Sequence, residues 1–441
     1  MIVEFSVTNF GSIRDTQTLS MIADRDDTLS EYYVVEAAGL RLLKLAILYG
    51  PNASGKTMML RALDCLHTLA TAPKAQKSDV LEIYPFQFSL QTRQSPTVFQ
   101  LVFVQNEIRY DYTVEVANRC ILREKMLYYP RGRSSELFTR ETDLDKQVTG
   151  LHIGSTTSIS NKGLAILEGN TLWNNTVLGA FGKSNVDWPE MMEVQRWFTD
   201  TLQMLIMPSM NVTDFADKVL EAAPEYKSLM IDFLEKADVQ ISDIRIKKDE
   251  EDLGEGKMTL VPVDEEMRIL KEDQKVTFQT QNLKIKRQSL FFTHEVENEK
   301  GERHHFELPW NFESKGTLQY YGLASILALM IKTSKINLID EFESNLHPDL
   351  MKHFILTFLA NARQSQLLIT THNVHLLNDK DILRYDVVWF TQKRSDGSTE
   401  IYSLADFDSG VFRKNGSIIN AYKAGKLGAV PHTGSIFIPQ Q

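Results

Sequence analysis

The spacing of apolar residues changes along the chain and predicts regions of different secondary structure. In the first third, apolar and polar residues alternate or form short apolar runs, which is typical of β-strands. The breaks between the last three of these segments contain Asn, Gly or Arg, and this pattern predicts an antiparallel meander. Strands are predicted at 2–7, 42–48, 86–90, 98–104, 109–116 and 121–129.

The middle of the chain is less regular. Residues 131–185 are rich in Gly, Ser, Thr and Asn and are predicted to be loops with short elements. The segment 247–272 is dense in charge and contains two glycines, so we expect an exposed, mobile loop there. Helices are predicted at 189–205 and 224–237, and strands at 276–292 and 304–308.

Strands and helices alternate in the last third, which is typical of a mainly parallel sheet. Helices are predicted at 317–331 and 347–362, and strands at 336–339, 366–370, 387–390 and 400–403. We therefore predict an α/β fold with a mixed sheet. Residues 1–130 and 301–441 would form the two halves of one core, and 131–300 an inserted α+β lobe.

Bulk composition excludes some classes of protein. The formal net charge of −10 argues against a uniformly basic nucleic-acid binder, but not against a local basic patch. Cys65 and Cys120 are too few for a disulfide framework, so we expect a reducing cytoplasm. The apolar run at 322–331 is far shorter than the ~20 residues needed to cross a bilayer.

A glycine-rich loop after the strand predicted at 42–48 has the spacing of a phosphate loop. Residues 50–57 read Gly-Pro-Asn-Ala-Ser-Gly-Lys-Thr and fit G-x-x-x-x-G-K-[ST]. The backbone N–H groups can bind phosphate oxygens, Lys56 can reach the β- and γ-phosphates, and the Thr57 hydroxyl can ligate Mg²⁺. Helical spacing at 57–69 places a helix N-terminus at the phosphates. The residues predicted to bind ATP are Asn52, Ser54, Gly55, Lys56 and Thr57.

Two later strands end in polar residues suited to the same site. Asp340 and Glu341 follow the strand at 336–339, and His372 follows the strand at 366–370. Asp340 is suited to hold Mg²⁺, and Glu341 to act as the general base that polarises an attacking water. His372 can sense the γ-phosphate. In isolation, acids at a strand end are common surface residues and a lone histidine is more often structural, but the phosphate loop upstream favours the functional interpretation.

These motifs together resemble those of ABC-type ATPase heads, as in SMC and RecF proteins. Residues 313–317 occupy the place of the ABC signature and keep Ser314 and Gly316, but differ from LSGGQ at Glu313, Lys315 and Thr317. The resemblance implies that Ser314 and Gly316 contact the ATP of a second head. The other matching segments are 7–14 for the first strand, 50–57 for Walker A, 340–341 for Walker B, 344–348 for the D-loop and His372 for the switch histidine.

A closer resemblance is to the bacterial abortive-infection ATPases called RloA or AbiLi, which are related to the ATPase subunit AriA of the PARIS anti-phage system. It rests on the ESxGT form of the signature, on residues 1–15 and on Gly-Lys-Leu-Gly-Ala-Val-Pro at 425–431. The resemblance is weak over 131–300. It implies a cytoplasmic homodimer or higher homo-oligomer that controls a nuclease- or toxin-like effector protein, with no membrane partner.

Several weaker candidates have two readings. Gln87 is a candidate Q-loop glutamine for Mg²⁺ or an exposed strand residue, and Arg14 can approach phosphates or DNA or be a plain surface residue. The basic segment 284–287 can touch nucleic acid, but a solvated strand face fits it better. The large side chains of Trp188, Met191, Met192, Trp197 and Phe198 are expected in the lobe core or a subunit interface.

Three functional hypotheses follow. The first is an ABC-type ATPase of an anti-phage system, in which ATP-driven head dimerisation controls a partner effector. The second is a DNA-repair or SMC-like ATPase that acts directly on DNA, against which stand the acidic charge and the lack of long heptad repeats. The third is a transport ATPase subunit, which the altered signature and the long insertion disfavour.

Overall fold

The computed structural model describes residues 1–130, 132–237, 239–252, 256–260, 276–280, 284–379, 382–407 and 417–430, and within 248–288 it describes the backbone only. The chain forms two compact units, Met1–Met210 with Leu327–Gln441, and Asn211–Ile326. These boundaries differ from the predicted ones at 130/131 and 300/301. Within the described ranges, no helix is both long and apolar enough to cross a bilayer.

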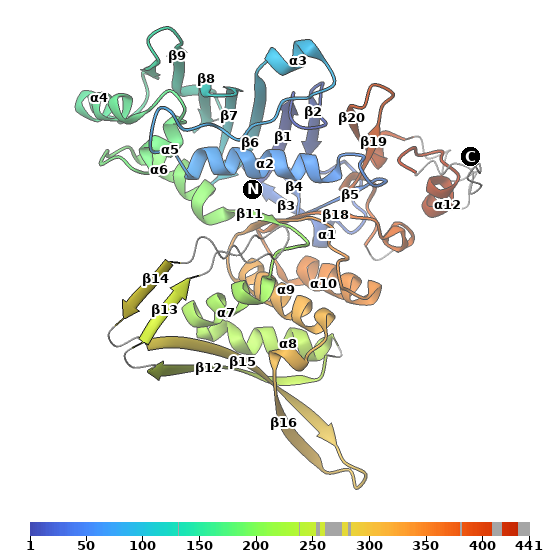
Figure 1. Cartoon of the computed structure of the whole chain (residues 1–441). Helices are drawn as coiled ribbons and strands as arrows, with labels where there is room; N and C mark the ends of the chain where they lie inside the picture. The colour runs from blue at the N-terminus through green and yellow to red at the C-terminus, as the bar shows by residue number, and fades with distance from the viewer. Residues whose placement is uncertain are drawn as a thin grey trace, which may run out of the picture. The chain divides into compact units, whose positions relative to one another are not determined.

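A six-stranded sheet in the first unit carries the motifs identified in the sequence (Figure 1). Neighbouring strands are parallel except the last pair, which is antiparallel. Each residue of β5 and β18 is buried, as expected for apolar strands inside a parallel sheet. In order, the strands are β11 (Leu202–Ile206), β17 (Ile336–Ile339), β18 (Gln366–Thr371), β5 (Leu45–Tyr49), β19 (Val388–Lys393) and β20 (Thr399–Ser403).

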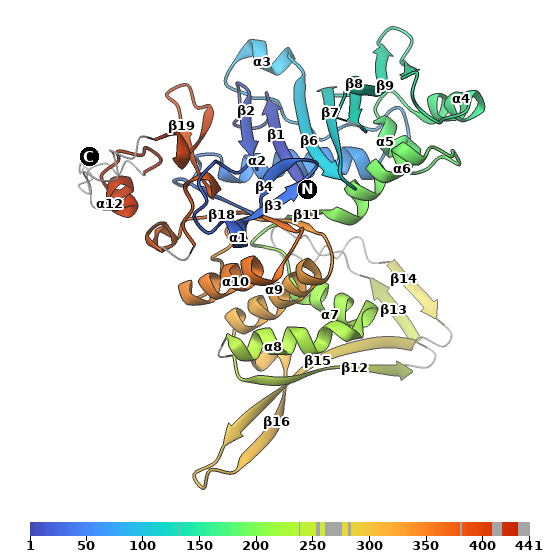
Figure 2. The same ribbon diagram turned by 180° about the vertical axis from the view of Figure 1, so that it is seen from behind.

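A seven-stranded antiparallel sheet forms the other layer of this unit, and it contains the predicted meander (Figure 2). Helix α2 (Lys56–Thr71) contacts β1 of this sheet and β11 and β18 of the six-stranded one. The strands, in sheet order, are β10 (Val148–Ile153), β9 (Ser135–Asp143), β8 (Cys120–Tyr129), β7 (Ile108–Ala117), β6 (Thr97–Gln105), β1 (Ile2–Thr8) and β2 (Gln17–Ser20).

Shorter elements complete the first unit. Helix α10 contacts α1, and α5 contacts α2. Strands β3 (Val34–Ala37) and β4 (Leu40–Leu43) form a separate hairpin. The helices are α1 (Ser30–Tyr33), α3 (Leu90–Gln94), α4 (Asn161–Asn170), α5 (Val177–Phe181), α6 (Pro189–Arg196), α10 (Pro348–Asn361) and α12 (Ile418–Lys423).

Three predictions for this unit were wrong in position. The lobe predicted at 131–300 does not begin at 131, because β9 pairs with β8 and β11 pairs with β17 within the first unit, and the loops predicted at 131–185 include the strands β9 and β10. The helix predicted at 189–205 ends early, passes through a π-helical turn at Trp197–Thr201 and continues as β11. Trp188, Met191, Trp197 and Phe198 are buried core residues of the first unit, whereas Met192 is 37% exposed.

Two predicted strands differ from those in the structure, since one is split into two strands and the other does not form. The run at 42–48 is split at Lys44, whose buried ammonium donates to the carbonyls of Leu359 and Ala362 at the end of α10, at 2.6 and 2.9 Å. The segment 86–90 is not a strand. The Asn9 side-chain oxygen accepts the Phe86 N–H, the Thr92 hydroxyl donates to the Phe86 carbonyl and the Arg93 side chain donates to the Gln87 carbonyl, so side chains bond this backbone in place of a strand partner.

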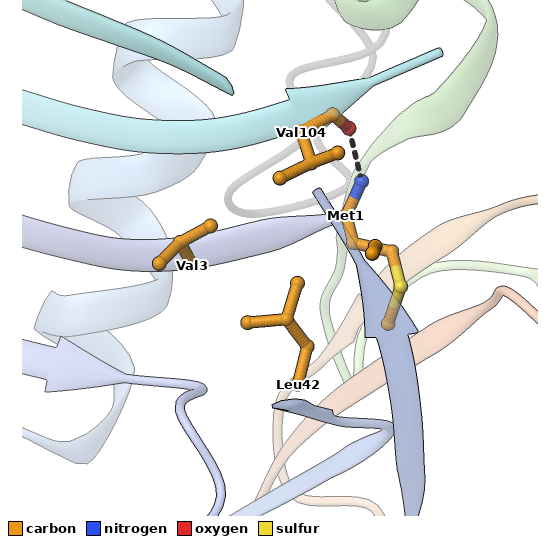
Figure 3. Close-up of a cluster of buried hydrophobic side chains, with 5 residues drawn as sticks. Met1, Val3, Leu42 and Val104 are labelled. Carbon is orange, nitrogen blue, oxygen red and sulfur yellow. Dashed lines mark hydrogen bonds between the residues drawn. The ribbon is translucent and has the colours of Figure 1, made fainter. Parts of the chain in front are cut away.

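A small apolar cluster joins the hairpin β3–β4 to the edge of β1 and β6 (Figure 3). Met1, Val3, Leu42 and Val104 are all buried there, and the Met1 nitrogen donates to the Val104 carbonyl at 2.6 Å. Burial of such side chains stabilises the fold by about 1.5–3 kcal/mol each. The cluster therefore fixes the hairpin that leads into β5.

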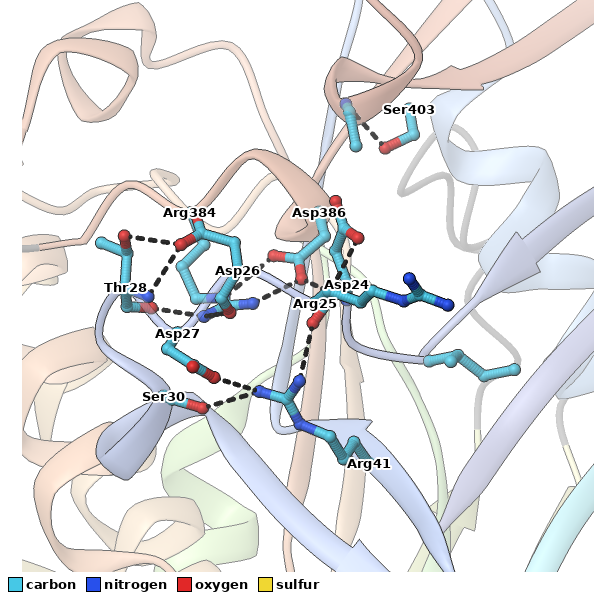
Figure 4. A network of polar contacts seen from close by, with 12 residues as sticks. Asp24, Arg25, Asp26, Asp27, Thr28, Ser30, Arg41, Arg384, Asp386 and Ser403 are labelled. Atoms are coloured by element: carbon cyan, nitrogen blue, oxygen red, sulfur yellow. Dashed lines mark hydrogen bonds and ion pairs between the residues drawn. The ribbon is translucent and has the colours of Figure 1, made fainter.

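A buried ion pair ties the segment after β18 to the N-terminal third (Figure 4). Arg384 donates to both carboxylate oxygens of Asp386, at 3.0 and 2.7 Å, and also to the carbonyls of Asp26 and Thr28. Asp386 in turn accepts from the Asp24 N–H at 2.9 Å. The side chains are 1% and 8% exposed, so each charge depends on the other.

The second unit combines helices and β-ribbons. Helix α8 packs against β12, and the Tyr321 hydroxyl donates to Asp217 at 2.8 Å. The mobile loop predicted at 247–272 is wrong where the backbone is described, because β12 extends to Asp252 and β13 follows. The elements are α7 (Val212–Ala222), α8 (Lys227–Lys236), β12 (Ile241–Asp252), β13 (Gly256–Leu260), β14 (Val276–Thr280), β15 (Lys284–Glu297), β16 (Arg303–Pro309) and the start of α9 (Lys315–Lys332).

We predict that Arg384→Ala lowers the stability of the protein by about 3–5 kcal/mol, because it leaves the Asp386 carboxylate buried and unpaired. Thermal unfolding followed by circular dichroism measures the effect. Arg394→Ala is the control, since Arg394 is 38% exposed in its pairs with Asp15 and Glu400 and should contribute less than about 1 kcal/mol. Equal shifts in the two variants would contradict the assignment.

Candidate nucleotide site

The loop at 50–55 connects β5 to α2 and requires glycine at two positions. Gly55 has a φ of +104°, a conformation that glycine adopts without a steric penalty. A Cβ at Gly55 would lie 2.1 Å from the Thr399 hydroxyl oxygen, and one at Gly50 would lie 2.3 Å from that of Thr391. The loop therefore packs directly on strands β19 and β20, and larger residues would displace it.

Side-chain hydroxyl groups of neighbouring residues hydrogen-bond this loop. The Ser54 and Thr391 hydroxyls are 2.5 Å apart, and the Thr399 hydroxyl donates to the Ser54 carbonyl at 2.9 Å. The Thr399 hydroxyl also lies 2.8 Å from that of Ser12. Ser54 is 1% exposed. Its side chain thus supports the loop, so a nucleotide contact from Ser54 would have to come from its backbone.

The start of α2 meets the acidic strand end. The Thr57 hydroxyl lies 2.9 and 3.0 Å from the two carboxylate oxygens of Asp340, and the Thr370 hydroxyl donates to one of the same oxygens at 2.6 Å. Because β17, β18 and β5 are adjacent parallel strands, their carboxyl ends lie at one edge of the sheet. This topology places Thr57 and Asp340 in contact with each other.

Lys56 lies between the loop and His372. Its ammonium donates to the carbonyls of Gly50 and Pro51 at 2.8 and 3.1 Å and lies 3.5 Å from His372 Nδ1. Burial lowers the pKa of Lys56, while the nearby carboxylates, Glu343 most strongly, act in the opposite direction. The ammonium of Lys56 is thus held beside the loop, near carboxylates that oppose the effect of burial on its pKa.

His372 and Glu341 face the same space. Loss of solvation lowers the pKa of His372, and the charge of Lys56 lowers it further, while the nearby carboxylates act in the opposite direction. Glu341 has a φ of 46°, a left-handed conformation that is uncommon for a residue with a side chain and clusters at functional sites. The Glu341 N–H donates to the Thr370 hydroxyl at 2.8 Å, which fixes the turn.

These groups enclose a pocket of about 400 Å³. This volume falls in the usual range for small-ligand sites. The pocket contains backbone donors, one ammonium, one carboxylate and one imidazole, a combination suited to a triphosphate. Its lining residues are Ser12, Asn52, Ala53, Ser54, Gly55, Lys56, Thr57, Met58, Glu341 and His372.

A family model described as "AAA domain, putative AbiEii toxin, Type IV TA system" matches residues 45–378, which is more than half of the chain and includes this whole arrangement except Ser12 and the β19–β20 support. The chain belongs to this family. It is an ATP-hydrolysing P-loop ATPase. No curated protein matches the chain.

The chain is similar to two solved structures at low sequence identity. The SMC head domain from Thermotoga maritima is 13% identical, with 91% of this chain and 98% of that chain covered and a TM-score of 0.37. An SMC head bound to the C-winged helix domain of ScpA is 10% identical, with 91% and 97% covered and a TM-score of 0.41.

The residues of this ATPase are suited to hold Mg²⁺. Thr57 and Asp340 present hard oxygen atoms at one point beside the phosphate loop, which are the ligands that Mg²⁺ prefers. In the described part of the chain, no group of three or more His, Cys, Asp and Glu residues could hold a metal by itself. This fits an ion held together with substrate phosphates, which would neutralise charge on the transferring phosphoryl group.

Other predicted site residues lie elsewhere. Ser314 and Gly316 belong to the second compact unit, where the Ser314 hydroxyl accepts the Thr317 N–H at 3.0 Å at the start of α9. Glu313, which departs from the usual signature, lies 2.6 Å from His294 Nε2 through a carboxylate oxygen. The segment that resembles the ABC signature therefore lies at the start of a helix. Ser314 and Gly316 are not among the described residues that line the pocket.

The structure does not bring Gln87 or Arg14 to the site. The Gln87 amide donates to the Pro85 carbonyl at 2.7 Å, and Gln87 is not among the described residues that line the pocket. Arg14 forms ion pairs with Asp15 and Asp396. The role predicted for Gln87 in Mg²⁺ binding has no support in this geometry. The side chains at 284–287 lie outside the described residues.

Several residues that hydrogen-bond the site residues or the phosphate loop were not predicted from the sequence. Thr370 bonds both Asp340 and Glu341, Glu343 bonds His372, and Thr391 and Thr399 support the loop. Thr370 lies two positions before His372, and Glu343 lies two positions after Glu341. This closeness in sequence is the only feature that could have predicted their role. Thr391 and Thr399 lie far away in the sequence and have no motif of their own.

We predict that Lys56→Ala loses at least about 100-fold in ATP affinity, because it removes the buried cation beside the phosphate loop. Thr57→Ala should instead retain nucleotide binding in EDTA and lose the gain in affinity that Mg²⁺ gives. Fluorescent ATP titration with and without Mg²⁺ separates the two outcomes. Lys183→Ala, a surface lysine far along the chain, serves as the control.

Proposed function

We propose that this ATPase is the nucleotide-driven switch of a bacterial anti-phage, abortive-infection system. ATP binding would close a homodimer of heads, hydrolysis would open it, and the cycle would hold or release a partner effector. The observation that carries the proposal is the complete loop, carboxylate and histidine arrangement within one chain, together with an intact serine–glycine pair that this pocket does not use. The toxin named in the family description supports a defence role.

In the proposed hydrolysis reaction, Glu341, Lys56 and His372 each have a separate role. Glu341 lines the pocket and acts as general base toward the attacking water. Lys56 stabilises charge on the phosphates, and His372 orients the γ-phosphate end. Lys56 keeps its bonds to the loop carbonyls until phosphate oxygens replace them.

The dimer half rests on the exposed start of α9. Ser314 and Lys315 are exposed, and Gly316 is partly exposed. A helix N-terminus with a serine hydroxyl and a glycine backbone can bind an anion, and the γ-phosphate of a nucleotide on a second copy is the anion that the resemblance to ABC-type heads implies. Two copies would then bind two ATP molecules between them.

The effector half rests on the resemblance to RloA, AbiLi and AriA. We propose that the partner is a nuclease- or toxin-like protein, which this chain controls in the cytoplasm. The nucleotide state would change which surface of the dimer is available to that partner. The alternative hypothesis is an ATPase that acts directly on DNA, and the experiments below distinguish the two.

We predict that Glu341→Gln binds ATP but accumulates as a dimer, because the amide cannot accept the proton of the attacking water. Light scattering after gel filtration, with and without ATP, measures the mass. The matched control is Glu341→Gln combined with Ser314→Arg, which should bind ATP and remain monomeric. A monomeric Glu341→Gln protein that hydrolyses ATP at the wild-type rate would refute the assignment.

We further predict that Glu341→Gln, expressed in its host with the neighbouring genes and purified in ATP, retains a stoichiometric protein partner. Mass spectrometry identifies that partner, and the Lys56→Ala protein is the control that should lose it. Recovery of nucleic acid and no protein would favour the DNA-acting ATPase, particularly if salt weakens the association steeply.

A further inference from the structure

Glu343 lies in the tight turn that follows the Walker B strand. The Phe342 N–H donates to the Thr370 carbonyl at 3.0 Å, so the turn rests on the end of β18. Within the turn, the Ser344 N–H donates to the Glu341 carbonyl at 2.8 Å. Glu343 does not line the pocket, which distinguishes it from Glu341.

Glu343 reaches across to the loop that carries the histidine. One carboxylate oxygen of Glu343 accepts the backbone N–H of His372 at 2.6 Å. Hydrogen bonds to a carboxylate are roughly twice as strong as those between neutral groups. The contact joins two loops whose residues are separated by 29 positions, and it fixes the point from which the imidazole extends.

The second carboxylate oxygen of Glu343 is buried and accepts no hydrogen bond within the described residues. An oxygen of this kind destabilises a fold because it has lost its hydrogen bonds to water, so its presence in a native structure needs a reason. By contrast, the side chain of Asp349, six positions later in the first turn of α10, is 89% exposed, so water can solvate its charge.

The surroundings of Glu343 supply that reason. Among the charges that act on Lys56, Glu343 has the largest effect, ahead of Asp340 and Glu341. It is also the carboxylate with the largest effect on His372 and the largest charge effect on the buried Tyr49 hydroxyl. The Glu343 carboxylate therefore lies near Lys56, His372 and Tyr49, and it is not among the described residues that line the pocket.

We propose that Glu343 is a positioning residue for ATP hydrolysis, which holds the His372 loop in register with Lys56 through its bond to the His372 backbone. The inference rests on the ATPase activity and is independent of the proposed dimer. A free His372 loop would let the imidazole move away from the γ-phosphate end, and a displacement of about 1 Å can reduce a rate by about 100-fold.

The test compares Glu343→Ala, Glu343→Gln, His372→Ala and the double variant Glu343→Ala/His372→Ala. Steady-state ATPase assays give kcat and KM, and fluorescent ATP gives the dissociation constant in the absence of turnover. Asp349→Asn is the matched control, because Asp349 is an exposed carboxylate close by in the sequence, in the first turn of α10. Thermal unfolding is recorded for every variant.

We expect Glu343→Ala to lower kcat by about 100-fold with little change in ATP affinity. Glu343→Gln keeps an oxygen that can accept the His372 N–H, so it should recover most of the lost rate. In the His372→Ala background, removal of Glu343 should add little further loss, because the two residues act as one unit.

Three results would overturn the proposal. These are a wild-type kcat in Glu343→Ala, a double variant whose loss is the product of the two single losses, and a Glu343→Gln protein that folds normally but is as slow as Glu343→Ala. If Glu343→Ala fails to fold, the rate of Glu343→Gln relative to Asp349→Asn decides the question.

Discussion

The hydrogen bonds between the Thr57 hydroxyl and the Asp340 carboxylate connect residues 283 positions apart, and the nucleotide site depends on this contact. It exists because β5, β18 and β17 are adjacent parallel strands whose carboxyl ends meet. The loop after β5 supplies the phosphate cradle, the end of β17 supplies the acids, and the end of β18 supplies the histidine. A change in strand order would separate these groups although each motif remained intact.

The strands next to the phosphate loop also determine its conformation. The phosphate loop has little side-chain volume of its own, so its conformation is imposed by β19 and β20, whose threonines occupy the space that a Cβ at Gly50 or Gly55 would need. The site is thus built on rigid strands, and its reactive groups come from the connections that follow them. Glu343 and Thr370 extend this principle, because each ties one connection to its neighbour.

Much of the α/β core could be predicted from sequence. The meander, the apolar strands and the helix after the phosphate loop carry strong periodicity, and Lys56, Thr57, Asp340 and His372 each follow a buried strand. The unit boundary could not be found, because β9, β10 and β11 belong to the first unit through pairing with distant strands, which composition does not reveal. The strand predicted at 86–90 does not form, and side chains instead bond its backbone, with Asn9 accepting the Phe86 N–H and Arg93 donating to the Gln87 carbonyl. Gln87 was assigned to the site by analogy, and its amide is bound within its own loop.

The most direct test of the central claim is an experimental structure of the Glu341→Gln protein with ATP and Mg²⁺. We expect phosphates within hydrogen-bond distance of Lys56 and the loop N–H groups, the ion at Thr57 and Asp340, and Ser314 of a second copy at the γ-phosphate. Nucleotide bound away from the 50–57 loop, or an ion that contacts neither Thr57 nor Asp340, would contradict it.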